Sequence, residues 1–233
     1  MTTKQIEALR ASLSSNADVT TTALKFTESI AQAIESGASE EALEEKLSTS
    51  WNILISLAAQ TDHGSQDPIV EFVKAVQKQK AGSSDRTVTI WGSEVRLWED
   101  MPLLGAGMRS AWNRAPDSGS EDDFSIPEWT NLNAFAARLT ASSPAIPTFD
   151  YSLYAIWTMR SAFEDETADA AAVEAAKMWF LYAGDVFERL SREGKSFDGP
   201  IAKGGQRFGG KAWRGFCEER LAVWKARLGR EGY

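Results

Sequence analysis

The chain has 233 residues, 43% of them hydrophobic, and is therefore long enough to bury a full core. Its net charge of -8 and sequence pI near 4.9 argue against nucleic acid as a partner, because phosphate neutralisation needs clustered Lys and Arg. The single cysteine, Cys217, excludes an intrachain disulfide, and no apolar run is long enough to cross a membrane. We expect a cytoplasmic protein that engages neither membrane nor nucleic acid.

The first half of the chain shows helical periodicity interrupted once. Apolar residues recur at helical spacing from Leu24 to Ile34, and again from Leu43 to Ala58 after an acidic helix start at Ser39. The only run with alternating, β-branched character is residues 87–91. We expect one short extended segment there rather than a sheet.

Three central helices are predicted in the second half, over about residues 127–141, 149–164 and 168–192. A glycine-rich stretch and a last amphipathic helix follow. The expected fold class is therefore all-α, an irregular helical bundle that forms a single domain over residues 1–233. Polar or glycine-rich composition predicts mobile loops near residues 81–87, 116–126 and 194–210.

Several aromatic motifs occur in a fixed order along the chain: Val88-Thr89-Ile90-Trp91-Gly92, Leu103-Leu104-Gly105, Trp129-Thr130-Asn131-Leu132-Asn133-Ala134-Phe135-Ala136, Trp157-Thr158-Met159-Arg160 and Met178-Trp179-Phe180-Leu181-Tyr182-Ala183-Gly184. This order resembles the DUF3632 family of uncharacterised, mostly fungal proteins, over about residues 45–228. The resemblance implies a helical, intracellular fungal protein, sometimes encoded beside natural-product genes. It implies no established activity.

Two short motifs imitate chemical sites. The only histidine, His63, follows an aspartate and precedes a serine, but neighbouring residues cannot form a catalytic triad. The run from Gly205 to Lys211 has the spacing of a phosphate-binding loop, yet Ala212 lacks the hydroxyl that would hold magnesium. One histidine and one cysteine also make a zinc site unfavourable. We expect no metal and no cofactor.

An acidic run gives a third hypothesis, magnesium-dependent terpene cyclisation. Residues 165–169 have the spacing of the acidic metal-binding motif of all-helical terpene cyclases. The partner motif would use Asn52, Ser56 and Gln60, and Gln60 replaces its carboxylate. A solvated helix start explains the acidic run as well.

Polar residues set among tryptophans on the central helices are the main site candidates. A buried Asn133 needs a hydrogen-bond partner, and the i, i+4 spacing of Arg160 and Glu164 predicts an ion pair. Facing helices of a bundle commonly form ligand sites. The residues expected to line one pocket are Trp129, Trp157 and Trp179 for substrate binding, with Asn133, Arg160, Glu164 and Tyr182 as catalytic groups.

Three functions follow from these patterns. The first is a cofactor-independent protein that binds a hydrophobic small molecule, such as a cyclase or isomerase of natural-product metabolism. In such an enzyme, Asn133 and Tyr182 would hydrogen-bond a substrate carbonyl, and Arg160 would stabilise developing negative charge. Glu164 would orient Arg160 or act as acid/base. The alternative is a non-catalytic interaction protein or homodimer using the acidic loop and surface tryptophans. Its expected surface tryptophans are Trp98, Trp213 and Trp224.

Overall fold

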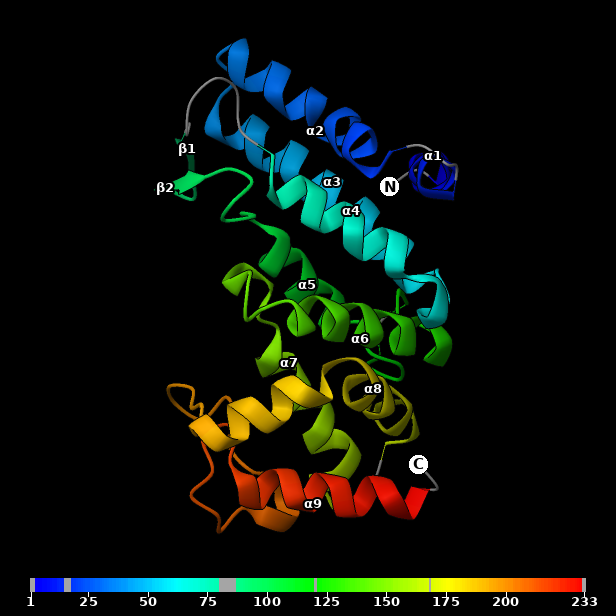
Figure 1. Cartoon of the computed structure of the whole chain (residues 1–233), viewed down its shortest axis with the longest axis vertical. Helices are drawn as coiled ribbons and strands as arrows, with labels where there is room; N and C mark the ends of the chain where they lie inside the picture. The colour runs from blue at the N-terminus through cyan, green and yellow to red at the C-terminus, as the bar shows by residue number, and fades with distance from the viewer. Residues whose placement is uncertain (1–2, 15–17, 80–86, 120, 168, 232–233) are drawn as a thin grey trace. The chain divides into compact units, whose positions relative to one another are not determined.

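The computed structural model describes the chain except residues 1–2, 15–17, 80–86, 120, 168 and 232–233 (Figure 1). Nearly all of its elements are helices, which confirms the all-α class. The chain divides into two compact units, Met1–Phe124 (unit 1) and Ser125–Tyr233 (unit 2). The expectation of a single domain stays a prediction.

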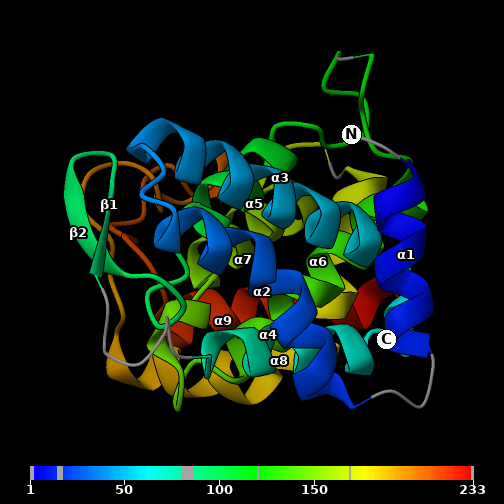
Figure 2. The same ribbon diagram turned by 90° about the horizontal axis from the view of Figure 1, so that it is seen from above.

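Unit 1 is a group of helices with a small β-hairpin. α2, α3 and α4 run alongside one another, α1 contacts all three, and α5 packs against α3 (Figures 1 and 2). The unit's elements are α1 (Thr3–Ser14), α2 (Val19–Glu35), α3 (Glu40–Ala59), α4 (Asp67–Gln77), β1 (Thr87–Ile90), β2 (Ser93–Arg96) and α5 (Leu104–Trp112).

Trp51 on α3 lies at the centre of the unit 1 core. Its side chain is fully buried, and its indole contacts the rings of Phe26 and Trp98. Its Nε1 donates a hydrogen bond to the Pro102 carbonyl oxygen at 2.7 Å. A buried indole therefore keeps its one polar atom satisfied while contributing a large apolar surface.

The extended segment is half of a hairpin, so the expectation of one isolated strand was wrong. β1 pairs with β2 in antiparallel register, with Ile90 opposite Ser93. Val88 and Ile90 face the core, as the alternation predicted. Trp91 and Gly92 form a two-residue turn with positive φ angles of 50° and 69°, the sign that a type I′ turn requires.

Unit 2 is organised around α8, which contacts α6, α7 and α9. A capping box starts α6, because Ser125 and Glu128 each bind the other's backbone amide. α8 is kinked at Ala183, whose φ and ψ are not helical. The unit's elements are α6 (Ile126–Ala141), the 3-10 turn η2 (Pro147–Phe149), α7 (Ser152–Met159), a π-helical turn η3 (Arg160–Glu164), α8 (Ala170–Glu193), the 3-10 turn η4 (Gln206–Phe208), α9 (Glu218–Leu228) and η5 (Gly229–Glu231).

The predicted loops have different outcomes. Most of residues 81–87 lie outside the described residues. The stretch 116–126 makes hydrogen bonds of its own. The Phe124 amide donates to the Arg114 carbonyl, and the Asp123 side chain accepts from the Gly119 amide. Residues 194–210 have the expected irregular backbone, but the amide of Gly205 is hydrogen-bonded to buried Glu164. No helix in the described part of the chain combines the length and apolar character needed to cross a membrane.

Candidate functional site

Asn133 forms a hydrogen-bonded cluster in the core of unit 2. Its Oδ1 accepts hydrogen bonds from the Thr158 hydroxyl and from Trp179 Nε1, both at 2.8 Å. Its Nδ2 donates to the Trp129 carbonyl oxygen at 3.0 Å. Asn133 and Trp179 have no exposed surface. The prediction that a buried Asn133 is satisfied is confirmed, and its partners are protein groups.

Glu164 does not pair with Arg160, so that expectation was wrong. Its carboxylate forms a two-pronged ion pair with Arg220, with Nε–Oε1 and Nη2–Oε2 distances of 2.7 Å and 3.0 Å. Both side chains have no exposed surface. The physical reason is the π-helical turn: the Asp165 amide bonds the Arg160 carbonyl five residues back, which breaks the i, i+4 alignment.

The Glu164–Arg220 pair also holds the glycine-rich stretch in place. Glu164 accepts further hydrogen bonds from the Gly205 amide at 2.7 Å and from Trp224 Nε1 at 2.6 Å. The remaining Arg220 donors bond backbone carbonyls, Nη1 those of Ala202 and Gly215 and Nη2 that of Lys203. The pair is thus fully satisfied and fixes local structure.

Arg160 and Trp157 meet at a different place, the surface around Ile201. The Ile201 carbonyl oxygen accepts from Trp157 Nε1 at 2.8 Å and lies 3.5 Å from Arg160 Nη1. Tyr182 lies elsewhere, with its ring 3.8 Å from the guanidinium carbon of Arg138. The seven expected site residues therefore divide among four places, and their catalytic and substrate-binding roles stay predictions.

The tryptophans expected at the surface are buried. Trp98, Trp213 and Trp224 expose 3%, 6% and 0% of their surface, so that expectation was wrong. Each indole finds apolar or aromatic neighbours, and Trp213 and Trp224 also cover the Arg220 guanidinium. The exposed tryptophan is instead Trp91, which leaves 68% of its surface open to solvent.

Trp91 is held at the tip of the hairpin by two carboxylates of α3. Its backbone amide donates to Glu44 Oε1 at 2.8 Å, and the Gly92 amide donates to Glu40 Oε1 at 2.7 Å. Bonds from amides to ionised carboxylates are among the stronger hydrogen bonds in proteins. The tip, Trp91 with Gly92, is thereby fixed against the first two turns of α3.

The net charge of the chain is confined to unit 1. Residues 1–124 contain nineteen Asp and Glu against eleven Lys and Arg, whereas residues 125–233 contain fourteen of each class. Further acids are exposed on the elements that form or hold the hairpin, Glu41 and Glu45 on α3 and Glu94 on β2. The indole of Trp91 is therefore displayed on an acidic unit.

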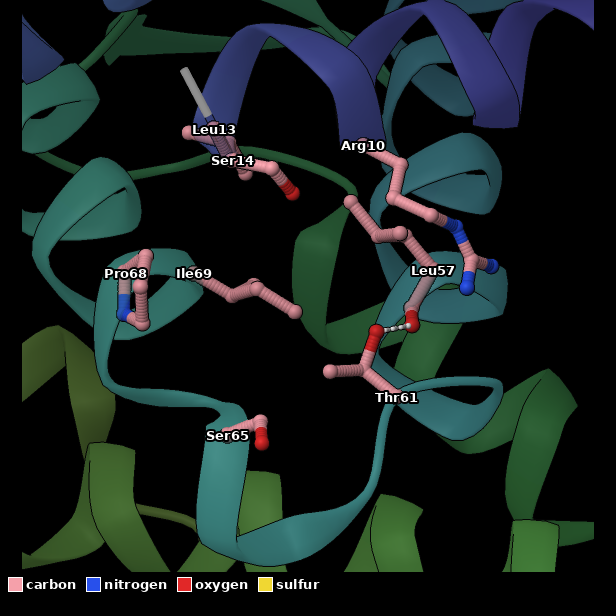
Figure 3. A pocket seen from close by; sticks show the side chains of 8 residues that line it. All are labelled: Arg10, Leu13, Ser14, Leu57, Thr61, Ser65, Pro68 and Ile69. Carbon is pink, nitrogen blue, oxygen red and sulfur yellow. Dashed lines mark hydrogen bonds between the residues drawn. The ribbon is translucent and has the colours of Figure 1, made fainter. Parts of the chain in front are cut away.

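Unit 1 has several surface hollows, and known ligand sites have volumes of about 300–1,000 Å³. One lies between α1, the end of α3 and the start of α4 (Figure 3) and has a volume of about 80 Å³. Leu57 and Ile69 supply apolar walls, and the Thr61 hydroxyl is engaged by the Leu57 carbonyl at 2.7 Å. This hollow is too small for a natural-product intermediate.

Two larger surface grooves include charged side chains. One has a volume of about 360 Å³ and includes Glu45 and Lys46, and the other has about 600 Å³ and includes Lys74 and Lys78. Among the described residues, no three His, Cys, Asp or Glu side chains lie close enough to hold a metal ion. His63 sits in a 3-10 turn whose N-cap, Asp62, accepts from the Gly64 amide.

Comparison with known proteins gives one match. The family model DUF3632, described as a protein of unknown function, matches residues 51–228. No curated protein and no solved structure matches the chain. The matched region includes the hairpin tip, the Asn133 cluster and the Glu164–Arg220 pair.

Proposed function

We propose that this chain, which belongs to the DUF3632 family, is a non-catalytic protein-interaction protein that binds a basic segment of a partner through Trp91. The observation that carries the proposal is the 68% exposure of an indole whose turn is fixed by two glutamates. Tryptophan is enriched among the residues that dominate binding energy at interfaces. A rigid indole loses little conformational entropy when a partner covers it.

The charge around the hairpin tip defines the partner chemistry. A Lys or Arg side chain can lie over the face of an exposed indole and pair with neighbouring carboxylates. Glu94 is exposed on β2, three residues after Trp91, and Glu41 is exposed on α3 beside Glu40, which binds the turn. A second copy of the chain fits this site less well, because unit 1 carries a net charge of -8 and like charges repel.

Backbone geometry supports a binding role as well. A non-glycine residue with positive φ costs of order 1–3 kcal/mol, and an aromatic side chain gains nothing locally from that conformation. Trp91 nevertheless has φ of 50°. The strained turn lowers stability and the exposed indole gains little from burial, so a contribution outside the folded chain explains why the indole is placed there.

The cyclase or isomerase hypothesis has less support. The oxygen of Asn133 and both oxygens of Glu164 are occupied by protein donors, which leaves them without capacity to bind a substrate. Terpene cyclisation has no further support, because among the described residues no three His, Cys, Asp or Glu side chains lie close enough to hold a metal ion. A catalytic group must be able to contact a substrate, and a buried group whose hydrogen bonds are all made within the protein does not.

Titration with a lysine-rich peptide tests the proposal. We expect saturable binding that weakens with salt, since pairing between exposed charges is screened. Trp91→Asn should abolish this binding. Leu181→Asn, which introduces the same residue at a half-exposed apolar position of unit 2, should leave it intact. Equal binding by both variants, or a dimer in light scattering that dissociates on Trp91→Asn, would contradict a basic partner at this site.

A further inference from the structure

β2 is the outer strand of the hairpin in unit 1. β1 packs against α3, and β2 lies on the outer side of the hairpin (Figures 1 and 2). Ser93, Glu94 and Arg96 on β2 are exposed, and Val95 is partly buried. An outer strand has one edge that no other strand covers, and the backbone groups on that edge can pair with a further strand.

The register of the hairpin determines which backbone groups lie on that edge. Ile90 and Ser93 flank the two-residue turn and pair with each other, so they exchange the first hydrogen bonds of the ladder. Bonded and non-bonded pairs alternate along antiparallel strands, which makes Thr89 and Glu94 a non-bonded pair. The amide and the carbonyl of Glu94 therefore point away from β1.

Arg96, two residues further along β2, supports this orientation. Its amide donates to Asp100 Oδ2 at 2.8 Å and its carbonyl accepts from the Asp100 amide at 2.9 Å, so both groups are engaged outside the ladder. At the turn end of β2, the Gly92 amide is bound by Glu40. For Glu94, the described residues supply a partner to neither backbone group. The edge is thus closed at both ends and open at Glu94.

We propose that the partner segment bound at Trp91 is an extended strand, which adds antiparallel to β2 through one pair of backbone hydrogen bonds at Glu94. This inference rests on the function proposed for Trp91 and specifies the conformation and register of the partner. A strand advances about 3.4 Å per residue, so a short segment centred on Glu94 also reaches the exposed indole at the turn.

The charge of Glu94 determines which side chain fits opposite it. Residues directly opposite each other on antiparallel strands have side chains on the same face, where opposite charges attract and like charges repel. A lysine or arginine of the partner therefore lies beside the Glu94 carboxylate. A second copy of the chain, adding the same edge, would place Glu94 opposite Glu94, which is unfavourable.

Two N-methylated peptides test the backbone pairing. The probe is a short peptide of alternating lysine and threonine, titrated against the full chain. With a lysine opposite Glu94, the lysine amides face β2 and the threonine amides face solvent. Methylation of the lysine amide nitrogens should weaken binding at least about tenfold, because it removes the donor to the Glu94 carbonyl. Methylation of the threonine amide nitrogens, the matched control, should leave the affinity unchanged.

Hydrogen exchange at the Glu94 amide gives a second readout. The bound peptide should slow exchange there at least about tenfold. The Arg96 amide, already bound by Asp100, is the internal control and should change little. Equal binding of both methylated peptides, or unchanged exchange at Glu94 in the saturated complex, would overturn the strand pairing and leave the function proposed for Trp91 standing. Absence of binding by the unmethylated peptide would overturn both.

Discussion

The hairpin tip of unit 1 and the buried polar groups of unit 2 use aromatic and polar side chains in opposite ways. In unit 2, the Asn133 cluster and the Glu164–Arg220 pair are buried and satisfied by protein donors and acceptors. In unit 1, two glutamates hold a strained turn so that Trp91 stays exposed. From this difference we infer that the Asn133 cluster and the Glu164–Arg220 pair stabilise the fold. The hairpin tip is the better candidate for contact with other molecules.

The largest expected effect comes from breaking the buried ion pair. Arg220→Met leaves the Glu164 carboxylate without its cation at 0% exposure, which should lower the free energy of unfolding by about 3–5 kcal/mol. Urea denaturation measures this loss. The double variant Glu164→Met with Arg220→Met should recover most of it. Arg192→Met, at an exposed site on α8, should change stability little, and an equal loss there would contradict the account.

Removing the buried amide should have the next largest effect. Asn133→Leu leaves the Thr158 hydroxyl and the Trp179 indole without their acceptor, at a cost of about 1–3 kcal/mol. Denaturation monitored by tryptophan fluorescence measures it. Asn131→Leu, on the same helix but only partly buried, should cost less. A stable Asn133→Leu protein would show that this cluster is not structural and would return attention to a ligand role.

A smaller loss is expected when the hairpin tip is released. Glu40→Gln with Glu44→Gln should weaken the two bonds to the turn amides by about 1 kcal/mol each, because neutral acceptors bind amides less strongly. Hydrogen exchange at the Trp91 and Gly92 amides should become faster. Glu45→Gln, exposed on the same helix, is the control. Unchanged exchange would show that the glutamates do not fix the turn.

The smallest effect concerns acid stability in unit 2. Burial raises the pKa of Asp150, but hydrogen bonds from Lys195 and Ser152 lower it more, so its pKa is below the ordinary value. The associated stability is present above the unfolded-state pKa and is lost as the pH falls through the folded-state pKa. Asp150→Asn should remove about 1 kcal/mol or less near neutral pH and reduce the acid dependence. Asp198→Asn should leave both unchanged.

The sequence predicted the helices well because their signals are local. Periodicity and the Ser39 cap fix where α3 forms, and the buried position of Asn133 followed from apolar residues on both sides of its helix stripe. The partner of Glu164 could not be predicted in this way. Arg220 is 56 residues away, and the π-helical turn that redirects Glu164 has no sequence signature comparable to helical periodicity.

The hairpin and the exposure of Trp91 are harder to predict from the sequence than the helices are. A glycine at position 92 after a β-branched run is compatible with a turn, but Trp91 is atypical for positive φ, so the local sequence signal for a hairpin is weak. Burial of the other tryptophans depends on tertiary packing, which helical spacing alone does not determine. The surface role was therefore assigned to Trp98, Trp213 and Trp224 instead of Trp91.

The free energy of unfolding of Trp91→Asn is the measurement that tests the central claim most directly. Asparagine tolerates positive φ better than tryptophan, and 68% of the indole is exposed, so stability should stay equal or rise by up to about 1 kcal/mol. Binding of the lysine-rich peptide should be lost in the same protein. A fall in stability of about 2 kcal/mol or more would show that Trp91 supports the fold, and would contradict a binding role for the hairpin tip.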